Sequence, residues 1–156
     1  MKIKKAIILG AGFGKRMHPI TKKIPKPLVK INNITLLENS INFLNSIGVK
    51  HIVINTHFRH KQISDFIRKK KFSSKIDLII EKRKILNTGG GILNASKIFI
   101  KQIFFVLNPD TLWRKGYKNE FRKSPHSRSI EGIKNLSKIR GNLCQMTFCQ
   151  PLVSEI

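Results

Sequence analysis

The sequence predicts an α/β fold of three layers, in which a mostly parallel sheet carries helices on both faces. Two observations predict it. Short apolar runs typical of buried strands alternate with segments of helical periodicity, and each of these runs ends at a glycine or a polar residue. Strands that alternate with helices favour a parallel sheet, because each helix returns the chain to the same edge. The 156 residues, 40% of them hydrophobic, suit one domain with one core.

The strands are expected in short runs of apolar, often β-branched residues. These runs are Ile3–Leu9, Ile52–Ile54, Ile76–Ile80 and Ile103–Leu107, with a weaker strand pattern at Phe148–Val153. Asp77 is a polar residue inside the third run, and Pro151 interrupts the last one.

The helices are expected between these strands. Thr35 and Glu38 form a capping-box pattern in front of a helix that Gly48 ends. Further helices are expected at Lys61–Lys71, from Gly89 to Ile98, and as a short element over Ile130–Leu136. Between His18 and Pro27, three prolines exclude a long helix.

The charge is strongly positive: 31 Lys and Arg against 8 Asp and Glu give a net charge of +23. This balance favours anionic partners such as nucleotides, although a composition rich in Lys, Ile and Asn also explains the excess. Cys144 and Cys149 lack the spacing and neighbours of a metal site and indicate a reduced, cytoplasmic setting. No apolar stretch is long enough for a membrane span.

Three polar segments follow predicted strands: Gly10–Arg16, Asn55–His57 and Asn108–Asp110. In parallel sheets ligands bind at the carboxyl ends of the strands, so we expect these segments to gather at one edge. The first is glycine-rich and would let backbone N–H groups approach phosphate oxygens. A dinucleotide fingerprint is disfavoured, because Lys15 stands where its third glycine would fall.

Two cations follow the glycines. Arg16 can clamp phosphate oxygens with two hydrogen bonds, and Lys26 is confined between two prolines. Together, the segment Leu9 to Met17 and the run Pro25-Lys26-Pro27-Leu28 resemble the signature of sugar-1-phosphate nucleotidylyltransferases. That signature reads roughly L-A-A-G-x-G-x-R-M-x-P-x-T-x-x-x-P-K-P-L, with Gly10 replacing an alanine here.

The resemblance implies a Rossmann-like nucleotidyltransferase fold and a set of site residues. Arg16 and Lys26 would be catalytic. The nucleotide-binding residues would be Leu9, Gly10, Ala11, Gly12, Gly14, Gly89 and Gly90.

Three later segments are similar to the same family. Asn55-Thr56-His57 resembles an N-x-H stretch of the branch that includes N-acetylmuramate-1-phosphate uridylyltransferase and mannose-1-phosphate guanylyltransferase-like proteins. Glu81 and the run Leu86 to Gly91 resemble E-x-x-x-x-L-[ED]-T-G-G-G, with Asn87 at the acidic position. Asn108 to Trp113 resembles N-[SAG]-D-T-x-W, with Pro109 at the small position.

These matches imply the remaining roles. Thr88 and Asn108 would contact substrate, and Asp110 would bind the Mg²⁺ cofactor. The implied reaction transfers a nucleotidyl group from an NTP, UTP or GTP, to a sugar 1-phosphate and releases pyrophosphate.

The resemblance covers residues 1–118, expected to form a nucleotide-binding core, and ends there. Residues 119–156 are expected to form a divergent tail, which a truncated or frame-shifted reading would explain; no Asp follows Asp110. Two alternatives stay open: a fragment that is inactive or only binds NTP, and a small basic nucleic-acid-binding domain. The oligomeric state is not indicated.

Overall fold

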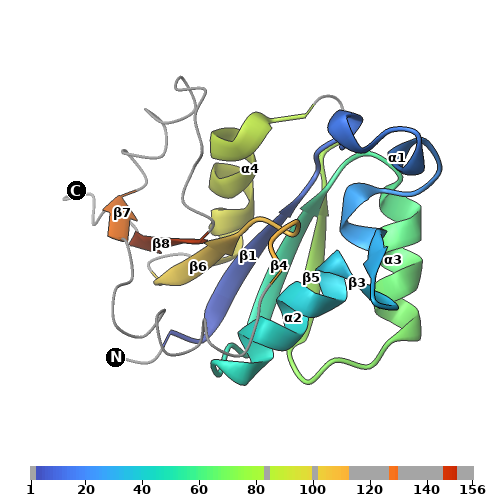
Figure 1. Cartoon of the computed structure of the whole chain (residues 1–156). Helices are drawn as coiled ribbons and strands as arrows, with labels where there is room; N and C mark the ends of the chain where they lie inside the picture. Colours follow the sequence, from blue (N-terminus) through green and yellow to red (C-terminus); the bar gives the residue numbers. More distant parts are fainter. Residues whose placement is uncertain (1–2, 83–84, 100–101, 113–126, 130–145, 151–156) are drawn as a thin grey trace.

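The computed structural model describes residues 3–82, 85–99, 102–112, 127–129 and 146–150. Their strands form a sheet of six in the order β5-β4-β1-β6-β8-β7, and a separate small hairpin pairs β2 with β3 (Figure 1). The sheet strands are β1 (Lys5–Gly10), β4 (His51–Thr56), β5 (Lys75–Ile80), β6 (Phe104–Leu107), β7 (Ser127–Ser129) and β8 (Met146–Gln150); the hairpin strands are β2 (Lys30–Ile31) and β3 (Ile34–Thr35).

The centre of the sheet is parallel. Strand β1 pairs in parallel with both β4 and β6, and β4 pairs in parallel with β5. Strand β8 runs antiparallel to β6, while β7 is parallel to β8. The predicted mostly parallel α/β sheet is therefore confirmed.

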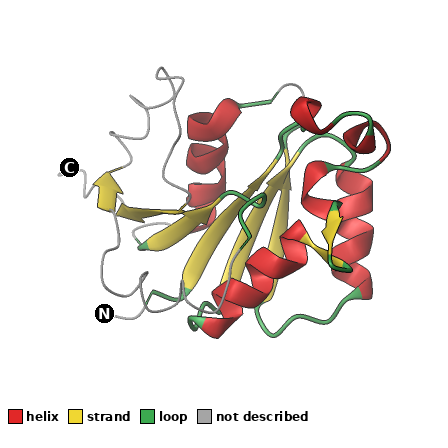
Figure 2. Ribbon diagram, in the orientation of Figure 1, coloured by secondary structure: helices red, strands yellow, loops and turns green. Residues whose placement is uncertain are grey.

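Helices lie on both faces of this sheet (Figure 2). The α-helices are α1 (Ile20–Lys23), α2 (Leu36–Ser46), α3 (His60–Lys69) and α4 (Asn87–Ser96), and the 3₁₀ helices are η1 (Lys15–Met17), η2 (Lys26–Leu28) and η3 (Lys97–Phe99). The prolines between His18 and Pro27 leave room only for one short α-helix and for η2, as expected.

Side-chain alternation along β1 explains the layers. Ala6 and Ile8 point into the core beneath α2 and α3, whereas Ile7 points to the opposite face, where α4 and η3 pack. All three side chains are fully buried. A strand that is apolar on both faces needs a helix layer on each of them, which is why the continuous apolar run predicts three layers.

Helix α2 begins and ends where the sequence indicates. The Thr35 hydroxyl accepts a hydrogen bond from the Glu38 backbone N–H at 3.1 Å. At the other end Gly48 has φ of 95°, and the Val49 and Gly48 N–H groups donate to the carbonyls of Leu44 and Asn45. This pair of hydrogen bonds is a Schellman-type ending, which glycine favours at that position.

Two expectations fall partly or wholly outside the described residues. The short helix predicted at 130–136 lies outside them, and so do residues 151–153 of the weak terminal strand. The described part of that strand is β8, which begins two residues before Phe148. Strands β7 and β8 both belong to the segment 119–156 and are part of the main sheet.

Candidate functional site

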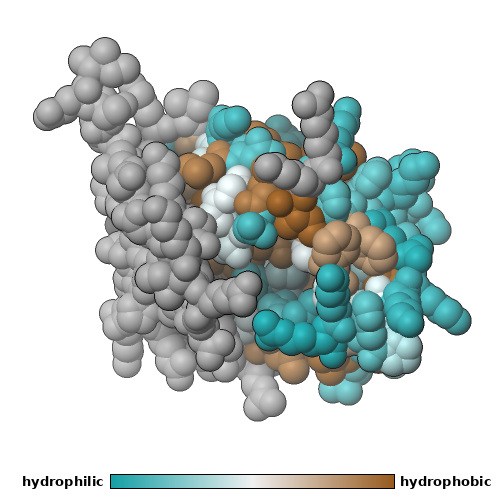
Figure 3. Space-filling view, turned by 90° about the horizontal axis from the view of Figure 1, so that it is seen from above, coloured by the Kyte–Doolittle hydropathy of each residue, from teal (hydrophilic) through white to brown (hydrophobic). Residues whose placement is uncertain are grey.

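A cleft lies at the carboxyl end of the parallel strands, with a volume of about 490 Å³, a size typical of small-molecule sites. Its lining comes from the ends of β1, β4 and β6, from η1 and η2, and from the start of α4. The lining residues are Leu9, Gly10, Ala11, Gly12, Gly14, Lys15, Arg16, Met17, Lys26, Pro27, Asn55, Ile85, Asn87, Thr88, Asn108, Pro109 and Asp110. At the end of the molecule that holds the cleft, hydrophobic and hydrophilic residues lie side by side, as the view from above in Figure 3 shows.

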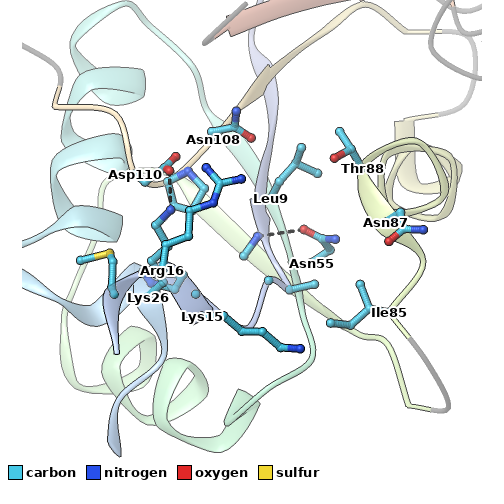
Figure 4. A pocket seen from close by; sticks show the side chains of 17 residues that line it. Leu9, Lys15, Arg16, Lys26, Asn55, Ile85, Asn87, Thr88, Asn108 and Asp110 are labelled. Carbon is cyan, nitrogen blue, oxygen red and sulfur yellow. Dashed lines mark hydrogen bonds and ion pairs between the residues drawn. The ribbon is translucent and has the colours of Figure 1, made fainter. Parts of the chain in front are cut away.

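One side of the cleft is charged. Arg16, Lys26 and Asp110 lie together there, although 84 positions separate Lys26 from Asp110 in the sequence (Figure 4). The Lys26 Nζ and Asp110 Oδ2 atoms form an ion pair at 2.5 Å, with side-chain exposures of 30% and 41%. The convergence of these three side chains on one pocket, expected from the motifs, is present.

The glycine-rich loop owes its shape to two close contacts. Gly14 has φ of 66°, and an added Cβ there would lie 3.0 Å from Lys26 Cβ and 3.1 Å from Thr21 Cγ2. The buried Thr21 hydroxyl donates to the Gly14 carbonyl at 2.8 Å. These contacts hold the loop against the segment that carries Lys26. Gly12 differs, since an added Cβ would meet nothing within 4 Å.

The opposite side of the cleft is uncharged. Ile85, Asn87 and Thr88 line it at and just before the start of α4, as Figure 4 shows. Asn87 has φ of 58° and is the first residue of the helix. Gly89 and Gly90, expected to contact nucleotide, are not among the lining residues; a Cβ on Gly90 would instead lie 2.9 Å from Leu86 Cβ.

Apart from Gly89 and Gly90, every residue that the sequence placed in the site lines the cleft. These residues are Leu9, Gly10, Ala11, Gly12, Gly14, Arg16, Lys26, Thr88, Asn108 and Asp110. Sequence reasoning assigned no role to several other lining residues, among them Lys15, Asn55, Ile85 and Asn87. Their one signal was position, since each lies within or beside a segment that carries a motif.

His57, which follows β4, does not line the cleft. Its Nδ1 donates to the Glu81 backbone carbonyl at 2.5 Å, and its ring packs edge-on against Phe13 with centroids 5.7 Å apart. These contacts give the histidine of the N-x-H stretch a place in the packing beside the glycine-rich loop.

Proteins can hold Mg²⁺ through a set of protein ligands alone, or through one or two carboxylates together with substrate phosphates, and Asp110 fits the second arrangement. In the described part of the chain, no group of three or more His, Cys, Asp and Glu side chains is placed to hold a metal ion. Mg²⁺ is, however, commonly bound by one or two carboxylates together with substrate phosphates. Asp110 lines a cleft that also offers Arg16 and Lys26 to phosphates, so it suits that second arrangement.

The fold and the cleft define the class: a Rossmann-like α/β protein whose candidate site lies at the carboxyl ends of its parallel strands. The chain belongs to the nucleotidyl transferase family, whose sequence model matches residues 5–134. That match extends past residue 118, where the motif resemblance ends.

Curated relatives agree with this family. The chain is 36% identical over 108 residues to D-glycero-alpha-D-manno-heptose 1-phosphate guanylyltransferase of Campylobacter jejuni, a match that covers 69% of this chain and 48% of the relative. It is 31% identical over 111 residues to N-acetylmuramate alpha-1-phosphate uridylyltransferase of Caulobacter vibrioides, covering 69% and 46%. The chain thus spans about half the length of these relatives.

Solved structures share the fold. HddC from Yersinia pseudotuberculosis, complexed with GMP-PN, superposes with a TM-score of 0.68 at 32% identity, over 81% of this chain and 58% of that one. A UDP-glucose pyrophosphorylase complexed with UDP-glucose has a TM-score of 0.65 at 21% identity, over 81% and 56%, and shows likeness of fold alone. Among the described residues, no helix has the length and apolarity needed to cross a membrane.

Proposed function

We propose that the chain carries the nucleotide site of an enzyme that transfers a nucleotidyl group from an NTP to a sugar 1-phosphate. A phosphate oxygen of the sugar 1-phosphate attacks the α-phosphorus of the NTP, the bond from that phosphorus to the bridging oxygen breaks, and pyrophosphate leaves. One observation carries the proposal: Arg16, Lys26 and Asp110 line the same 490 Å³ cleft as the glycine-rich loop.

The charged side of the cleft would bind the triphosphate. Phosphoryl-type transfers need little covalent help from the protein, so positioning and charge neutralisation supply most of the catalysis. The backbone from Gly10 to Gly14 would approach the phosphates, and Arg16 would bind the oxygens of the leaving pyrophosphate. Lys26 would stabilise negative charge that develops around the reacting phosphorus.

Asp110 is the residue that would hold Mg²⁺. When bound, this ion would neutralise phosphate charge and orient the polyphosphate. In this structure the Asp110 carboxylate is paired with Lys26, so that each side chain has a partner of opposite charge.

The uncharged side would receive the base or the sugar. Asn87 and Thr88 offer an amide and a hydroxyl there, and Leu9 and Ile85 offer apolar surface. The relatives' names include both guanylyl- and uridylyltransferases, and we therefore take GTP and UTP as the nucleotides to test first. The two cysteines, which lack the spacing of a metal site, favour a cytoplasmic setting for the reaction. Heptose, mannose and N-acetylmuramate 1-phosphates are the corresponding acceptors.

The test is pyrophosphate release with each pair of NTP and sugar 1-phosphate in the presence of Mg²⁺. Lys26→Ala and Arg16→Ala should each lower kcat/KM about 100-fold or more, because each removes a cation that faces developing charge. Lys30→Ala, which removes an exposed lysine outside the cleft, is the matched control and should retain full turnover. Unchanged turnover in both cleft variants would refute the assignment.

A second candidate function is nucleotide binding without transfer. It is favoured because the match covers only about half of each relative. Titration of the protein with GTP and UTP separates the two. Saturable binding without pyrophosphate release over the whole acceptor panel would support binding alone.

A further inference from the structure

A buried bridge of two side chains lies at the floor of the cleft. Asn55, at 2% exposure, accepts a hydrogen bond through Oδ1 from the Gly10 backbone N–H at 3.0 Å. Its Nδ2 donates to Glu81 Oε1 at 2.7 Å, and Glu81 is 4% exposed. The second Glu81 oxygen, Oε2, accepts from the Leu86 backbone N–H at 2.9 Å. We call this chain of hydrogen bonds the Asn55–Glu81 bridge.

The bridge connects the two sides of the cleft. Gly10 begins the glycine-rich loop, and Leu86 directly precedes Asn87 and Thr88 on the opposite side. Asn55, between them, lines the cleft itself (Figure 4). The three hydrogen bonds therefore tie the end of β1 to the start of α4 by way of the end of β4.

The direction of each hydrogen bond is fixed by the backbone. A backbone N–H can only donate, so the Asn55 atom facing Gly10 must be its oxygen, and its amide nitrogen must face Glu81. The Leu86 N–H also donates, so both Glu81 oxygens act as acceptors. The bridge thus needs an amide at position 55 and a side chain with two acceptor oxygens at position 81.

The third glycine of the run makes room for the bridge. An added Cβ on Gly91 would lie 2.6 Å from Asn55 Nδ2 and 3.2 Å from Glu81 Oε1. The first of these distances is too short for any side chain without displacement of Asn55. Gly91 thus allows α4 to pack closely on the two polar side chains.

We propose that Asn55 and Glu81 are positioning residues, which set the distance between the glycine-rich loop and the Asn87–Thr88 segment and thereby the fit of the nucleotide. This inference rests on the proposed function, since it assumes that the cleft binds an NTP. Neither side chain takes part in the chemistry. They act through the backbone of Gly10 and Leu86.

The proposal can be tested by exchanging the amide at position 55 and the carboxylate at position 81, which reverses the direction of the hydrogen bond between them. Glu81→Gln puts an NH₂ group against either Asn55 Nδ2 or the Leu86 N–H, so that two donors face each other. Asn55→Asp puts a carboxylate oxygen against Glu81 Oε1, so that two acceptors face each other. In the double variant N55D/E81Q, the new carboxylate at position 55 accepts from both the Gly10 N–H and the new amide at position 81. The oxygen of that amide then accepts from the Leu86 N–H.

The measurement is the Kd for GTP and for UTP, by titration calorimetry with Mg²⁺, together with the Tm of each protein. Each single variant should bind the preferred NTP at least about tenfold more weakly than wild type, because a buried polar atom loses its partner. The double variant should recover to within about threefold of wild type, since every donor again faces an acceptor. Rescue of this kind distinguishes positioning from a general loss of packing.

Asn45→Asp is the matched control. It makes the same substitution at a partly buried amide near the end of α2, outside the cleft, where the Asn45 Oδ1 atom has no hydrogen-bond partner. It should lower the Tm and leave the Kd for NTP unchanged.

If the wild-type protein binds NTP, two results would overturn this inference and leave the proposed function standing. One is a Kd of the single variants equal to that of wild type. The other is a double variant that binds NTP no more tightly than the weaker of the two single variants. If a single variant does not fold, the double variant still tests the inference, because it is required to fold and to bind NTP. A wild-type protein that binds no NTP would refute the proposed function, and this role with it.

Discussion

The two ends of the parallel sheet each carry a basic side chain in short contact with an aspartate, in different surroundings. At the carboxyl end Lys26 Nζ lies 2.5 Å from Asp110 Oδ2, and toward the amino end His51 Nε2 lies 2.6 Å from Asp77 Oδ2. The first pair opens on a cleft. The second lies against an aromatic side chain, with the His51 ring 5.0 Å from the Phe99 ring.

The two contacts have nearly the same length, so their surroundings, and not their geometry, separate the candidate site from the structural contact. Glycines at positions 10, 12 and 14 line the same cleft as Lys26 and Asp110, and Gly12 leaves open space there. Beside His51, by contrast, the fully buried Phe99 ring packs edge-on against the imidazole. Lys5 also lies over this ring, at 5.2 Å from its centroid.

The largest expected effect comes from exchanging one carboxylate at each end. Asp110→Asn should lower kcat/KM for pyrophosphate release about 100-fold or more, because the cleft loses the carboxylate that we propose as the Mg²⁺ ligand. Asp77→Asn, the same substitution at the other end, should leave turnover unchanged. Steady-state assays at neutral pH check both. Equal losses in the two variants would remove the distinction between the two ends.

A smaller effect is expected from two glycines of the cleft. Gly14→Ala should lower the free energy of unfolding by about 1–2 kcal/mol, because φ of 66° is unfavourable for alanine and the new Cβ crowds Lys26 and Thr21. Gly12→Ala, in open space, should retain stability and weaken NTP binding by placing a methyl group where phosphate would approach. Urea unfolding and NTP titration of both variants separate strain from ligand exclusion. Identical behaviour of the two would contradict these separate roles.

The smallest effect concerns acid stability at the amino end. The hydrogen bond from His51 lowers the pKa of Asp77, and the nearby Lys75 charge adds to this against the opposing effect of burial. Because the folded-state pKa lies below the unfolded-state pKa, the unfolded chain binds more protons in the interval between them. The stabilisation is therefore complete above about pH 4, the ordinary range for an aspartate, and is lost as the pH falls through the folded-state pKa.

Asp77→Asn should remove this pH-dependent part, about 0.5 kcal/mol once screening at this partly exposed pair is allowed for. Urea unfolding of both proteins from neutral to acid pH measures it. If the difference in free energy of unfolding between wild type and variant grew toward acid pH, the linkage would have the opposite sign.

Much of this fold could be predicted from local pattern. The apolar runs, the Thr35 cap and the Gly48 stop are recognised within a few residues of sequence, and the structure confirms them. The placement of Lys26 opposite Asp110 followed from a motif and from the rule that strand ends meet at one edge.

What could not be predicted depends on long-range contacts. The glycines at 89–91 suggest a ligand from their sequence alone, yet Gly91 makes room for Asn55, which belongs to a distant strand. Likewise, no local signal shows that β8 runs antiparallel to β6, because direction depends on the intervening path and not on strand composition.

Among the described strands, β5 is the outermost on its side of the sheet, and four of its six residues are apolar: Ile76, Leu78, Ile79 and Ile80. Such an edge is a template for pairing with the edge of another molecule. Asp77 stands within this run, and a strand that docked there would have to strip water from its carboxylate and from Lys75. The aspartate that gives the fold its acid sensitivity therefore also places a charge within the edge strand, a feature that disfavours edge-to-edge pairing.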